Sequence, residues 1–385
     1  MKTKIAFLME HIITGGIETC LFQLLSVMKD NPDLDITVIT KHSVSNKSIS
    51  DFFVRNKIAL VDYDKYYRVF SPDSSQKILD KLYWKIRKRI DKTAIRKQLS
   101  QYDLLIDYFN GSFFGIVRKV NKPKIAVFHG AFEAYLQTGL CWNACKVYDK
   151  IVCISESFYK DIQRMSDDNI NKYEFIYNPI DVRQILSAGK EPAPMKIDSK
   201  YFIMVARLHP DKDHETLLRA FKKFLTAEKN PDVKLVLCGT GPLLDDMQKM
   251  ASELKIDNNV IFMGDTPNPH VYVRNAMANI LSTYGEGLPM SLIEAQILGT
   301  VNVASSVKSG IAEILMYGDA GFLFPQGGIN ALSKIMSKIY HNEFNKNAMI
   351  KCAQDNLYRF DAKNIANKFY QLFNEVIQGK KTISA

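Results

Sequence analysis

The sequence predicts an α/β protein with two Rossmann-like, doubly wound parallel-sheet domains, and three observations lead to this prediction. Apolar runs of strand length alternate with helical patterns along the whole chain. Its 385 residues are enough for two domains that each bury a core. A segment rich in proline and charge, 187–200, separates two series of strands. We therefore expect domains over 1–190 and 191–365, and a C-terminal helix over 366–385 that could pack back on the first domain.

The strand predictions follow the apolar runs, and helical patterns fill most of the intervals between them. In the first half of the chain the predicted strands are Lys4–Met9, Ile36–Thr40, Leu104–Tyr108, Lys124–Phe128, Ile151–Ile154 and Phe175–Tyr177. In the second half they are Tyr201–Ala206, Lys234–Cys238, Val260–Met263, Asn279–Ser282 and Val301–Ala304. Sheets built in this way bind ligands beyond the carboxyl ends of their strands, so two such sheets that face each other form one central cleft.

Composition narrows the classes of function. The formal net charge of +10 and the pI of about 9.1 favour an anionic partner: nucleic acid, a membrane surface or a phosphate-bearing substrate. No apolar run approaches the ~20 residues of a membrane-spanning helix, and Met1–Glu10 reads as a charged entry into a strand instead of a signal peptide. We therefore expect a cytoplasmic protein. The six cysteines show no metal-ligand or disulfide spacing, so we expect reduced thiols.

The segment Leu79–Leu99 differs from the rest of the chain because cations surround an apolar stripe. Leu82, Ile86 and Ile90 fall on one face of a predicted helix, and lysines and arginines crowd the remainder. A basic amphipathic helix can bind an anionic membrane, at about 1 kcal/mol for each cation that reaches the surface. The alternative is the solvated face of an ordinary packed helix.

The run GEGLPMSLIEA, 285–295, places two glutamates around the start of a predicted helix. Pro289 suits the first helical position because its missing N–H would have no partner there. Glu286 then stands on the turn after a strand, and Glu294 lies about 8 Å further along the helix axis. Backbone N–H groups at the helix start can bind an anion, and the two carboxylates can accept hydrogen bonds from the hydroxyls of one carbohydrate. The alternative is two surface glutamates where negative charge suits a helix start.

Two cations follow a buried strand in the same half of the chain. Arg207 comes directly after the run FIMVA, and Lys212 precedes a helix that Asp213 can cap. Arginine gives forked hydrogen bonds and lysine a point charge, so the pair suits a diphosphate. Solvated charges beside a helix cap are the alternative for each residue alone. The combination with Glu286 and Glu294 favours a binding site.

Motifs over most of the chain resemble those of one enzyme family. They are TGGIE at 14–18, FHG at 128–130, ISES at 154–157, YNPID at 177–181, ARLHPDKDH at 206–214, GTGP at 239–242, GEGLPMSLIEA at 285–295 and SGIAEIL at 309–315. In this order and spacing the chain resembles the retaining, nucleotide-sugar-dependent glycosyltransferases of glycosyltransferase family 4. The resemblance implies the two-domain GT-B fold of that family.

The resemblance also implies roles for single residues. Arg207 and Lys212 would hold the donor diphosphate. Glu294 would bind the nucleotide ribose, and Glu286 would bind hydroxyls of the donor sugar. His129, at the carboxyl end of a strand, would lie beside the reacting sugar. Four of these residues, His129, Glu286, Arg207 and Lys212, are therefore the catalytic candidates.

Backbone groups complete the predicted donor site. Gly287, Leu288 and Pro289 would line the phosphate end of the donor. Gly15 and Gly16 would let the loop after the first strand approach the donor closely, as glycine permits.

Four positions depart from the family pattern. The family usually has Gly at Ala206 and often at Asp213, commonly Pro-Val-Val at Val301–Val303, and often paired glycines at Ser309–Gly310. At these positions the phosphate contacts and the donor preference of this chain can differ from those of the family.

From the resemblance we expect a metal-independent retaining hexosyltransferase without a cofactor. It would move a hexose or N-acetylhexosamine from a nucleotide diphosphate sugar to a saccharide, with UDP-sugars the first choice of donor and GDP-mannose the next. A lipid-linked acceptor of bacterial surface polysaccharide assembly, at the inner face of the cell membrane, fits the basic segment. The triplets Asp33–Asp35, Asp62–Asp64 and Asp211–Asp213 have a D-x-D pattern, but their places near turns and in the cationic loop indicate no metal site.

Two other classes stay open. A sugar-nucleotide epimerase on the same scaffold would act on the nucleotide sugar without an acceptor. A non-enzymatic protein would bind sugar or nucleic acid. The basic residues lack an interleaved aromatic platform, apart from Tyr83 and Trp84, which argues against nucleic acid.

Overall fold

The computed structural model describes residues 2–13, 15–64, 91–130, 145–165 and 170–384. The chain divides into two compact units. The first comprises 1–154, 159–180 and 362–385, and the second comprises 155–158 and 181–361. Apart from the short stretch 155–158, the chain passes to the second unit at Asp181 and returns to the first unit at Ala362; the composition led us to expect the change near 190.

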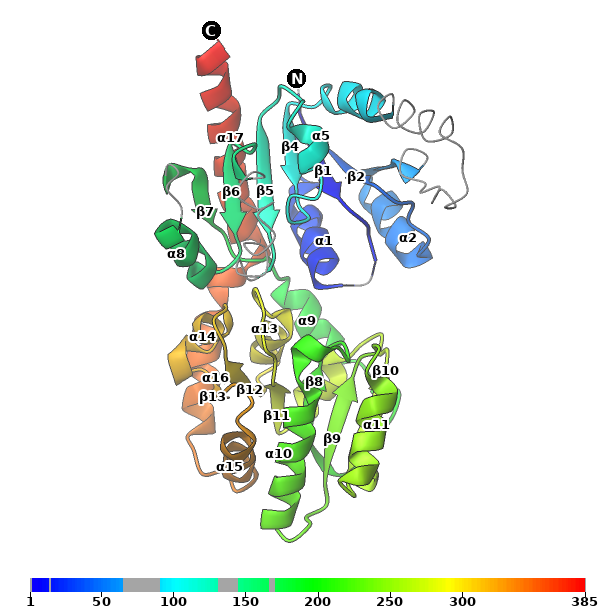
Figure 1. The fold of residues 1–385 in the computed structure, drawn as a ribbon, viewed down its shortest axis with the longest axis vertical. Helices are drawn as coiled ribbons and strands as arrows, with labels where there is room; N and C mark the ends of the chain where they lie inside the picture. Colours follow the sequence, from blue (N-terminus) through cyan, green and yellow to red (C-terminus); the bar gives the residue numbers. More distant parts are fainter. Residues whose placement is uncertain (1, 14, 65–90, 131–144, 166–169, 385) are drawn as a thin grey trace, which may run out of the picture. The chain divides into compact units, whose positions relative to one another are not determined.

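The first unit contains a parallel sheet with the strand order β3-β2-β1-β4-β5-β6-β7 among its described residues (Figure 1). These strands are β1 (Thr3–Met9), β2 (Leu34–Thr40), β3 (Ala59–Asp62), β4 (Leu104–Asp107), β5 (Lys124–Phe128), β6 (Lys150–Cys153) and β7 (Tyr173–Phe175). Its helices include α1 (Gly16–Met28), α2 (Lys47–Asn56), α5 (Phe114–Val117), most of α8 (Glu156–Met165) and α17 (Ala362–Ser384).

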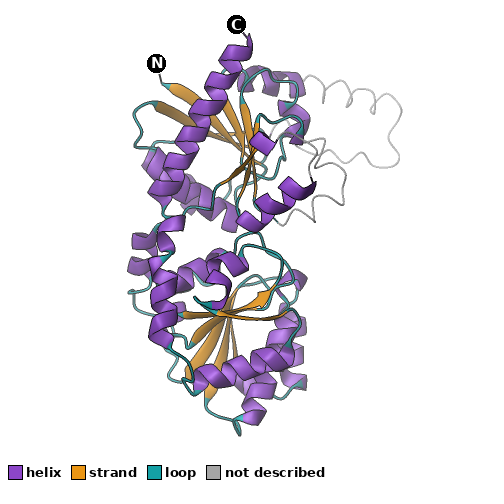
Figure 2. Ribbon diagram, turned by 90° about the vertical axis from the view of Figure 1, so that its left-hand side faces the viewer, coloured by secondary structure: helices purple, strands orange, loops and turns teal. Residues whose placement is uncertain are grey.

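The second unit repeats this architecture with the strand order β10-β9-β8-β11-β12-β13. Its strands are β8 (Lys200–Val205), β9 (Val233–Cys238), β10 (Val260–Gly264), β11 (Ala278–Leu281), β12 (Val301–Ser306) and β13 (Phe322–Pro325). Its helices are α9 (Val182–Ala188), α10 (His214–Ala227), α11 (Leu244–Glu253), α12 (His270–Asn275), α13 (Met290–Ile297), α14 (Ile311–Ile314), α15 (Ile329–Tyr340) and α16 (Lys346–Asp355). Helices lie on both faces of each sheet (Figure 2).

Most of the predicted strands are confirmed, and β5 has the predicted bounds. The run Phe175–Tyr177 was placed too late, since β7 spans Tyr173–Phe175. Two edge strands were missed. The side chains of β3 are exposed or half-buried, so that strand carries little apolar signal, and β13 ends on Pro325.

The last helix, α17, belongs to the first unit. There the ring of Phe373 meets Phe7 of β1 edge to face at 6.5 Å between centroids, and both side chains are buried.

In the predicted basic segment, residues 79–90 lie outside the described part of the chain. Residues 91–99 are helical, with Ile95 and Leu99 buried. Among the helices that the structure describes, none combines the length and the apolar character needed to span a membrane.

Candidate functional site

The strand order of the second unit places Arg207 and Glu286 on loops that follow neighbouring strands. Strand β8 lies between β9 and β11, so the connections leave it in opposite directions. Such a switch in strand order opens a crevice at the carboxyl ends of a parallel sheet, where ligands bind. Arg207 follows β8, and Glu286 follows β11.

The loop that carries Arg207 is held from one side by the GTGP motif. The N–H of Leu208 donates to the carbonyl of Thr240 at 2.9 Å. Gly239 has a φ of +137°, and a Cβ there would lie 2.1 Å from the carbonyl oxygen of Ala206. Only glycine allows this close approach of the two loops.

The same loop is tied on its other side to the residues after β11. The hydroxyl of Thr283 donates to the carbonyl of Asp211 at 2.7 Å, and the hydroxyl of Ser282 donates to the carbonyl of Asp213 at 2.9 Å. Asp213 caps α10 by accepting from the N–H of Thr216 at 3.2 Å, which confirms the predicted cap. Asp213 has a φ of +47°, a conformation that glycine adopts most easily and aspartate tolerates.

These contacts bring Lys212 and Glu286 together. Lys212 Nζ lies 2.6 Å from Glu286 Oε1 and 3.2 Å from Asp211 Oδ2. Arg207 is more open, with a side chain 70% exposed and 3.9 Å from Asp211 Oδ2. His209 Nδ1 lies 2.5 Å from Asp211 Oδ1. The structure therefore groups three of the predicted residues in one cluster of charges.

Burial and ion pairing act in opposite directions on the two carboxyls of this cluster. Burial raises the pKa of Glu286 above its usual value, although Lys212 partly offsets the effect. Burial would also raise the pKa of Asp211, but Lys212 and His209 hold it below its usual range. Lys212 thus lowers the pKa of both carboxyls, but burial outweighs it at Glu286 and not at Asp211.

Glu294 lies on α13, which begins at Met290, one residue later than predicted. Pro289 is the N-cap residue, with a ψ of 109°. The carboxylate of Glu294 faces His270, with 3.3 Å between Oε2 and Nε2. The sequence did not single out His270.

The backbone of 287–289 packs against the SGIAEIL motif. The N–H of Gly310 donates to the carbonyl of Gly287 at 2.9 Å, and a Cβ on Gly310 would lie 2.6 Å from Leu288 Cδ1. Glu313 of the same motif accepts from the N–H groups of Glu156 and Ser157, at 2.9 and 2.6 Å. The structure therefore joins three motifs that the sequence keeps apart.

In the first unit, Gly15 and Gly16 form the start of α1 after β1. A Cβ on Gly15 would lie 2.6 Å from Glu18 Oε2, whereas the space beside Gly16 is open. Glu18 is buried, which raises the pKa of its carboxyl, and its Oε1 lies 3.9 Å from His11 Nε2. Glu18 is the last residue of the TGGIE motif, and its local sequence indicates no role for it.

His129 follows β5 and is 9% exposed. Its backbone N–H donates to Asn110 Oδ1 at 2.7 Å, and its ring packs on Tyr108 with 4.8 Å between centroids. Burial lowers the pKa of the imidazole to about 4, with the Tyr108 backbone and Asn178 acting in the opposite direction. The ring is therefore neutral near pH 7, and its nitrogens make no well-aligned hydrogen bond with a described residue.

A buried carboxyl that the sequence did not single out lies one strand away, at the end of β4. Asp107 Oδ2 accepts from the hydroxyl of Tyr148 at 2.6 Å and from the N–H of Phe113 at 2.8 Å. Burial raises the pKa of Asp107 to about 7, against the effect of the Tyr148 hydrogen bond. The hydrogen bond from Phe113 to Asp107 fixes the turn that precedes α5. Asn110 lies in this turn and accepts a hydrogen bond from the backbone N–H of His129.

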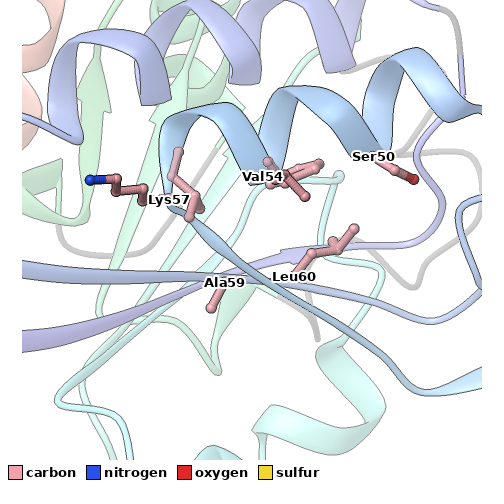
Figure 3. A pocket seen from close by; sticks show the side chains of 7 residues that line it. Ser50, Val54, Lys57, Ala59 and Leu60 are labelled. Carbon is pink, nitrogen blue, oxygen red and sulfur yellow. The ribbon is translucent and has the colours of Figure 1, made fainter.

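A hollow of about 470 Å³ lies between α2 and β3 (Figure 3). Val54 on the helix and Leu60 on the strand line it, with Lys57 at the turn between the two elements. None of the predicted site residues lines this hollow.

Within the described part of the chain, no group of three or more His, Cys, Asp or Glu side chains could hold a metal ion.

Comparisons with known proteins agree with this architecture. Residues 190–356 match the family model described as Glycosyl transferases group 1. An uncharacterized glycosyltransferase of Methanocaldococcus jannaschii is 30% identical over 167 residues, which span 42% of this chain and only 39% of that protein. The structure of Anabaena Alr3699/HepE in complex with UDP and glucose matches with a TM-score of 0.76 and 17% identity, over 97% of this chain and 100% of that one. The chain has a GT-B fold.

The GT-B fold is thus confirmed. A second relative matches the sequence over a longer part of the chain than the protein of Methanocaldococcus jannaschii does. The UDP-Gal:alpha-D-GlcNAc-diphosphoundecaprenol alpha-1,3-galactosyltransferase of Escherichia coli is 23% identical over 397 aligned positions, which cover 97% of this chain and 94% of that enzyme. Arg207, Lys212, Glu286 and Glu294 all lie within the residues that the family model matches.

Proposed function

We propose that this chain is a retaining glycosyltransferase that moves a hexose or N-acetylhexosamine from a nucleotide diphosphate sugar, with UDP as the nucleotide, to a saccharide acceptor. One observation carries the proposal: Lys212 Nζ and Glu286 Oε1 lie 2.6 Å apart at neighbouring strand ends of the second unit. A cation and an acceptor at such a switch in strand order suit a ligand that has both an anionic and a hydroxylated part.

We assign the donor diphosphate to Arg207 and Lys212. The diphosphate gains negative charge as it leaves the sugar, and cations fixed in advance stabilise that charge without rearrangement. The guanidinium of Arg207 is 70% exposed and can fork over two phosphate oxygens. The Lys212 side chain is 12% exposed, so its charge acts where water is largely excluded. We infer that these residues meet the need without an essential metal.

We assign the hydroxyls of the donor sugar to Glu286 and the nucleotide ribose to Glu294. In the proposed step, the bond between the anomeric carbon and the diphosphate oxygen breaks, and the diphosphate keeps the electron pair. The acceptor oxygen bonds to the same face of the sugar, and its proton passes to a phosphate oxygen. Such a step needs no nucleophile from the protein.

His129 is our candidate for a contact with the reacting sugar. Its neutral imidazole can accept or donate a hydrogen bond without adding a charge, because burial keeps the pKa at about 4. Burial and the contacts of the ring with the Tyr108 backbone and Asn178 hold the imidazole in place at the end of β5.

We propose a lipid-linked acceptor and a peripheral position at the inner face of a bacterial cell membrane. The name of the Escherichia coli relative includes a diphosphoundecaprenol acceptor, and the segment 79–99 carries many cations. Flotation with anionic vesicles tests this part. Neutralising Arg87, Lys88 and Arg89 should abolish flotation, and unchanged flotation of that variant would contradict the basic segment as the anchor.

The reaction itself is tested with UDP-sugars and a lipid-diphosphate-linked saccharide. Product with the anomeric configuration of the donor, measured by NMR, supports a retaining transferase, and inverted product contradicts it. Incubation with the UDP-sugar alone is the second arm, because conversion to an epimer without acceptor would indicate an epimerase instead.

A further inference from the structure

The carboxylate of Glu294 has a histidine beside it that belongs to a different helix. His270, the first residue of α12, places Nε2 3.3 Å from Glu294 Oε2, and both side chains are 17% exposed. The N–H direction is not aligned for a full hydrogen bond, and among the described residues Nε2 has no hydrogen-bonding partner. The contact is therefore a close polar contact between two half-buried side chains.

Asn268 fixes the other nitrogen of the same ring. Its amide nitrogen donates to the carbonyl of Ala188 at 2.9 Å and to Glu191 Oε2 at 2.7 Å. Its amide oxygen therefore faces His270, where it accepts from the backbone N–H at 3.2 Å and lies 3.2 Å from Nδ1. An oxygen acceptor at this position requires a proton on Nδ1.

The two contacts give the imidazole one orientation. Nδ1 donates toward Asn268, and Nε2 faces the carboxylate of Glu294, to which it donates when both ring nitrogens carry a proton. Asn268 is itself held by Ala188 and Glu191, so a turn of the ring breaks its contacts with both Asn268 and Glu294. A side chain held in this way restricts the rotation of the carboxylate that it touches.

We propose that His270 is a positioning residue that holds Glu294 Oε2, so that the carboxylate presents its second oxygen to the ribose hydroxyls of the donor nucleotide. The inference rests on the proposed function, since it takes Glu294 as the ribose acceptor. It adds that the hydroxyl specificity of the site depends on α12 as well as on α13.

The test compares the binding of nucleotides with and without ribose hydroxyls. Titration calorimetry measures the dissociation constants of UDP, GDP and their 2′,3′-dideoxy forms for the wild type and for His270→Leu, His270→Gln and Glu294→Gln. We expect the wild type to prefer the hydroxylated form of the nucleotide by about 10-fold or more, the size expected for a hydrogen bond to a charged group. In His270→Leu this preference should fall to about 2-fold or less, with binding of the dideoxy form unchanged.

The other variants separate positioning from folding. His270→Gln keeps an N–H donor near Glu294 and should retain most of the preference. His341→Leu is the matched control, because His341 Nε2 pairs with Glu228 Oε2 at 2.7 Å elsewhere in the same unit. That control should leave the preference unchanged.

Each remaining outcome is decisive. If His270→Leu keeps the full preference while Glu294→Gln loses it, the positioning role is wrong and the ribose assignment stands. If Glu294→Gln also keeps it, or if the wild type binds neither UDP nor GDP, both the inference and the proposed donor site are wrong.

Discussion

Lys212 Nζ and Glu286 Oε1 lie 2.6 Å apart although the two residues are 74 positions apart in the sequence. Hydrogen bonds from Thr283 and Ser282 to the carbonyls of Asp211 and Asp213 bring their loops together. Hydrogen bonds from side-chain hydroxyls to backbone carbonyls therefore hold the loops that carry the charges of the proposed donor site. Preorganised charges of this kind are what electrostatic catalysis requires.

The first prediction concerns the cation at the centre of this cluster. Replacing Lys212 with methionine keeps most of the length of the side chain and removes the charge that would stabilise the leaving diphosphate. We expect kcat/KM for transfer to fall about 10²-fold or more, measured with the UDP-sugar that the wild type uses. Lys249→Met is the control, since Lys249 pairs with Glu253 on an exposed helix face. Equal rates in both variants would remove Lys212 from the reaction.

The second prediction concerns the pH profile. Burial raises the pKa of Glu286 above its usual value, with Lys212 opposing the shift. As the pH falls through this raised value, the carboxyl takes up a proton and loses its pairing with Lys212. We expect kcat/KM to decline on the acid side at a higher pH than an ordinary glutamate would give. In Glu286→Gln, kcat/KM should be lower at every pH, and the decline on the acid side should be absent. An unchanged decline in this variant would show that it comes from another ionisable group.

The third prediction concerns stability and Asp107. Burial raises the pKa of this carboxyl from 3.8 to about 7. Between these values the folded chain holds a proton that the unfolded chain has lost, so this group makes the protein less stable as the pH rises through the window. Asp107→Asn should show a shallower loss of unfolding free energy over the same window, measured by urea denaturation. Parallel pH dependences in the two proteins would contradict the assignment.

The fourth prediction concerns a buried amide pair beneath the proposed site. Asn279 Nδ2 donates to Asn302 Oδ1 at 2.9 Å, and Asn302 Nδ2 donates to the carbonyl of Leu292 on α13 at 2.8 Å. Asn302→Val leaves the buried amide of Asn279 without this acceptor and should cost about 1–3 kcal/mol of unfolding free energy. Adding Asn279→Val should recover part of the loss, because both partners are then apolar. Strictly additive losses would show that the pair is not coupled.

The fifth prediction concerns the glycine behind Arg207. A Cβ at Gly239 would lie 2.1 Å from the carbonyl oxygen of Ala206, and the φ of +137° disfavours any side chain. Gly239→Ala should lower the melting temperature and weaken nucleotide binding together. Gly115→Ala is the control, since a Cβ there meets nothing within 4 Å. Wild-type nucleotide affinity in Gly239→Ala would show that the loop of Arg207 does not need this close approach.

Much of the fold could be predicted from apolar runs, because strands of a parallel sheet are buried on both faces. Strand β5 is fully buried and had the predicted bounds. The edge strand β3 has two half-buried residues between two exposed ones, so its sequence resembles a loop. The pattern was therefore strongest at the centre of each sheet and weakest at its edges.

The candidate site could be predicted only where its residues lie on recognisable turns. Glu286 and Lys212 each follow an apolar run, and their partnership follows from the order of the strands. His270 and Asp107 carry no such local signal. Asp107 meets Tyr148, 41 positions away, and a pairing at that separation depends on the folded chain.

The most direct test of the central claim is the affinity of UDP for the wild type, Lys212→Met and Glu294→Gln, measured by titration calorimetry. The proposed donor site predicts that UDP binds the wild type, and that each substitution weakens binding about 10-fold or more while the melting temperature of the free protein is kept. Wild-type affinity in both variants would contradict the claim that Lys212 and Glu294 bind one nucleotide.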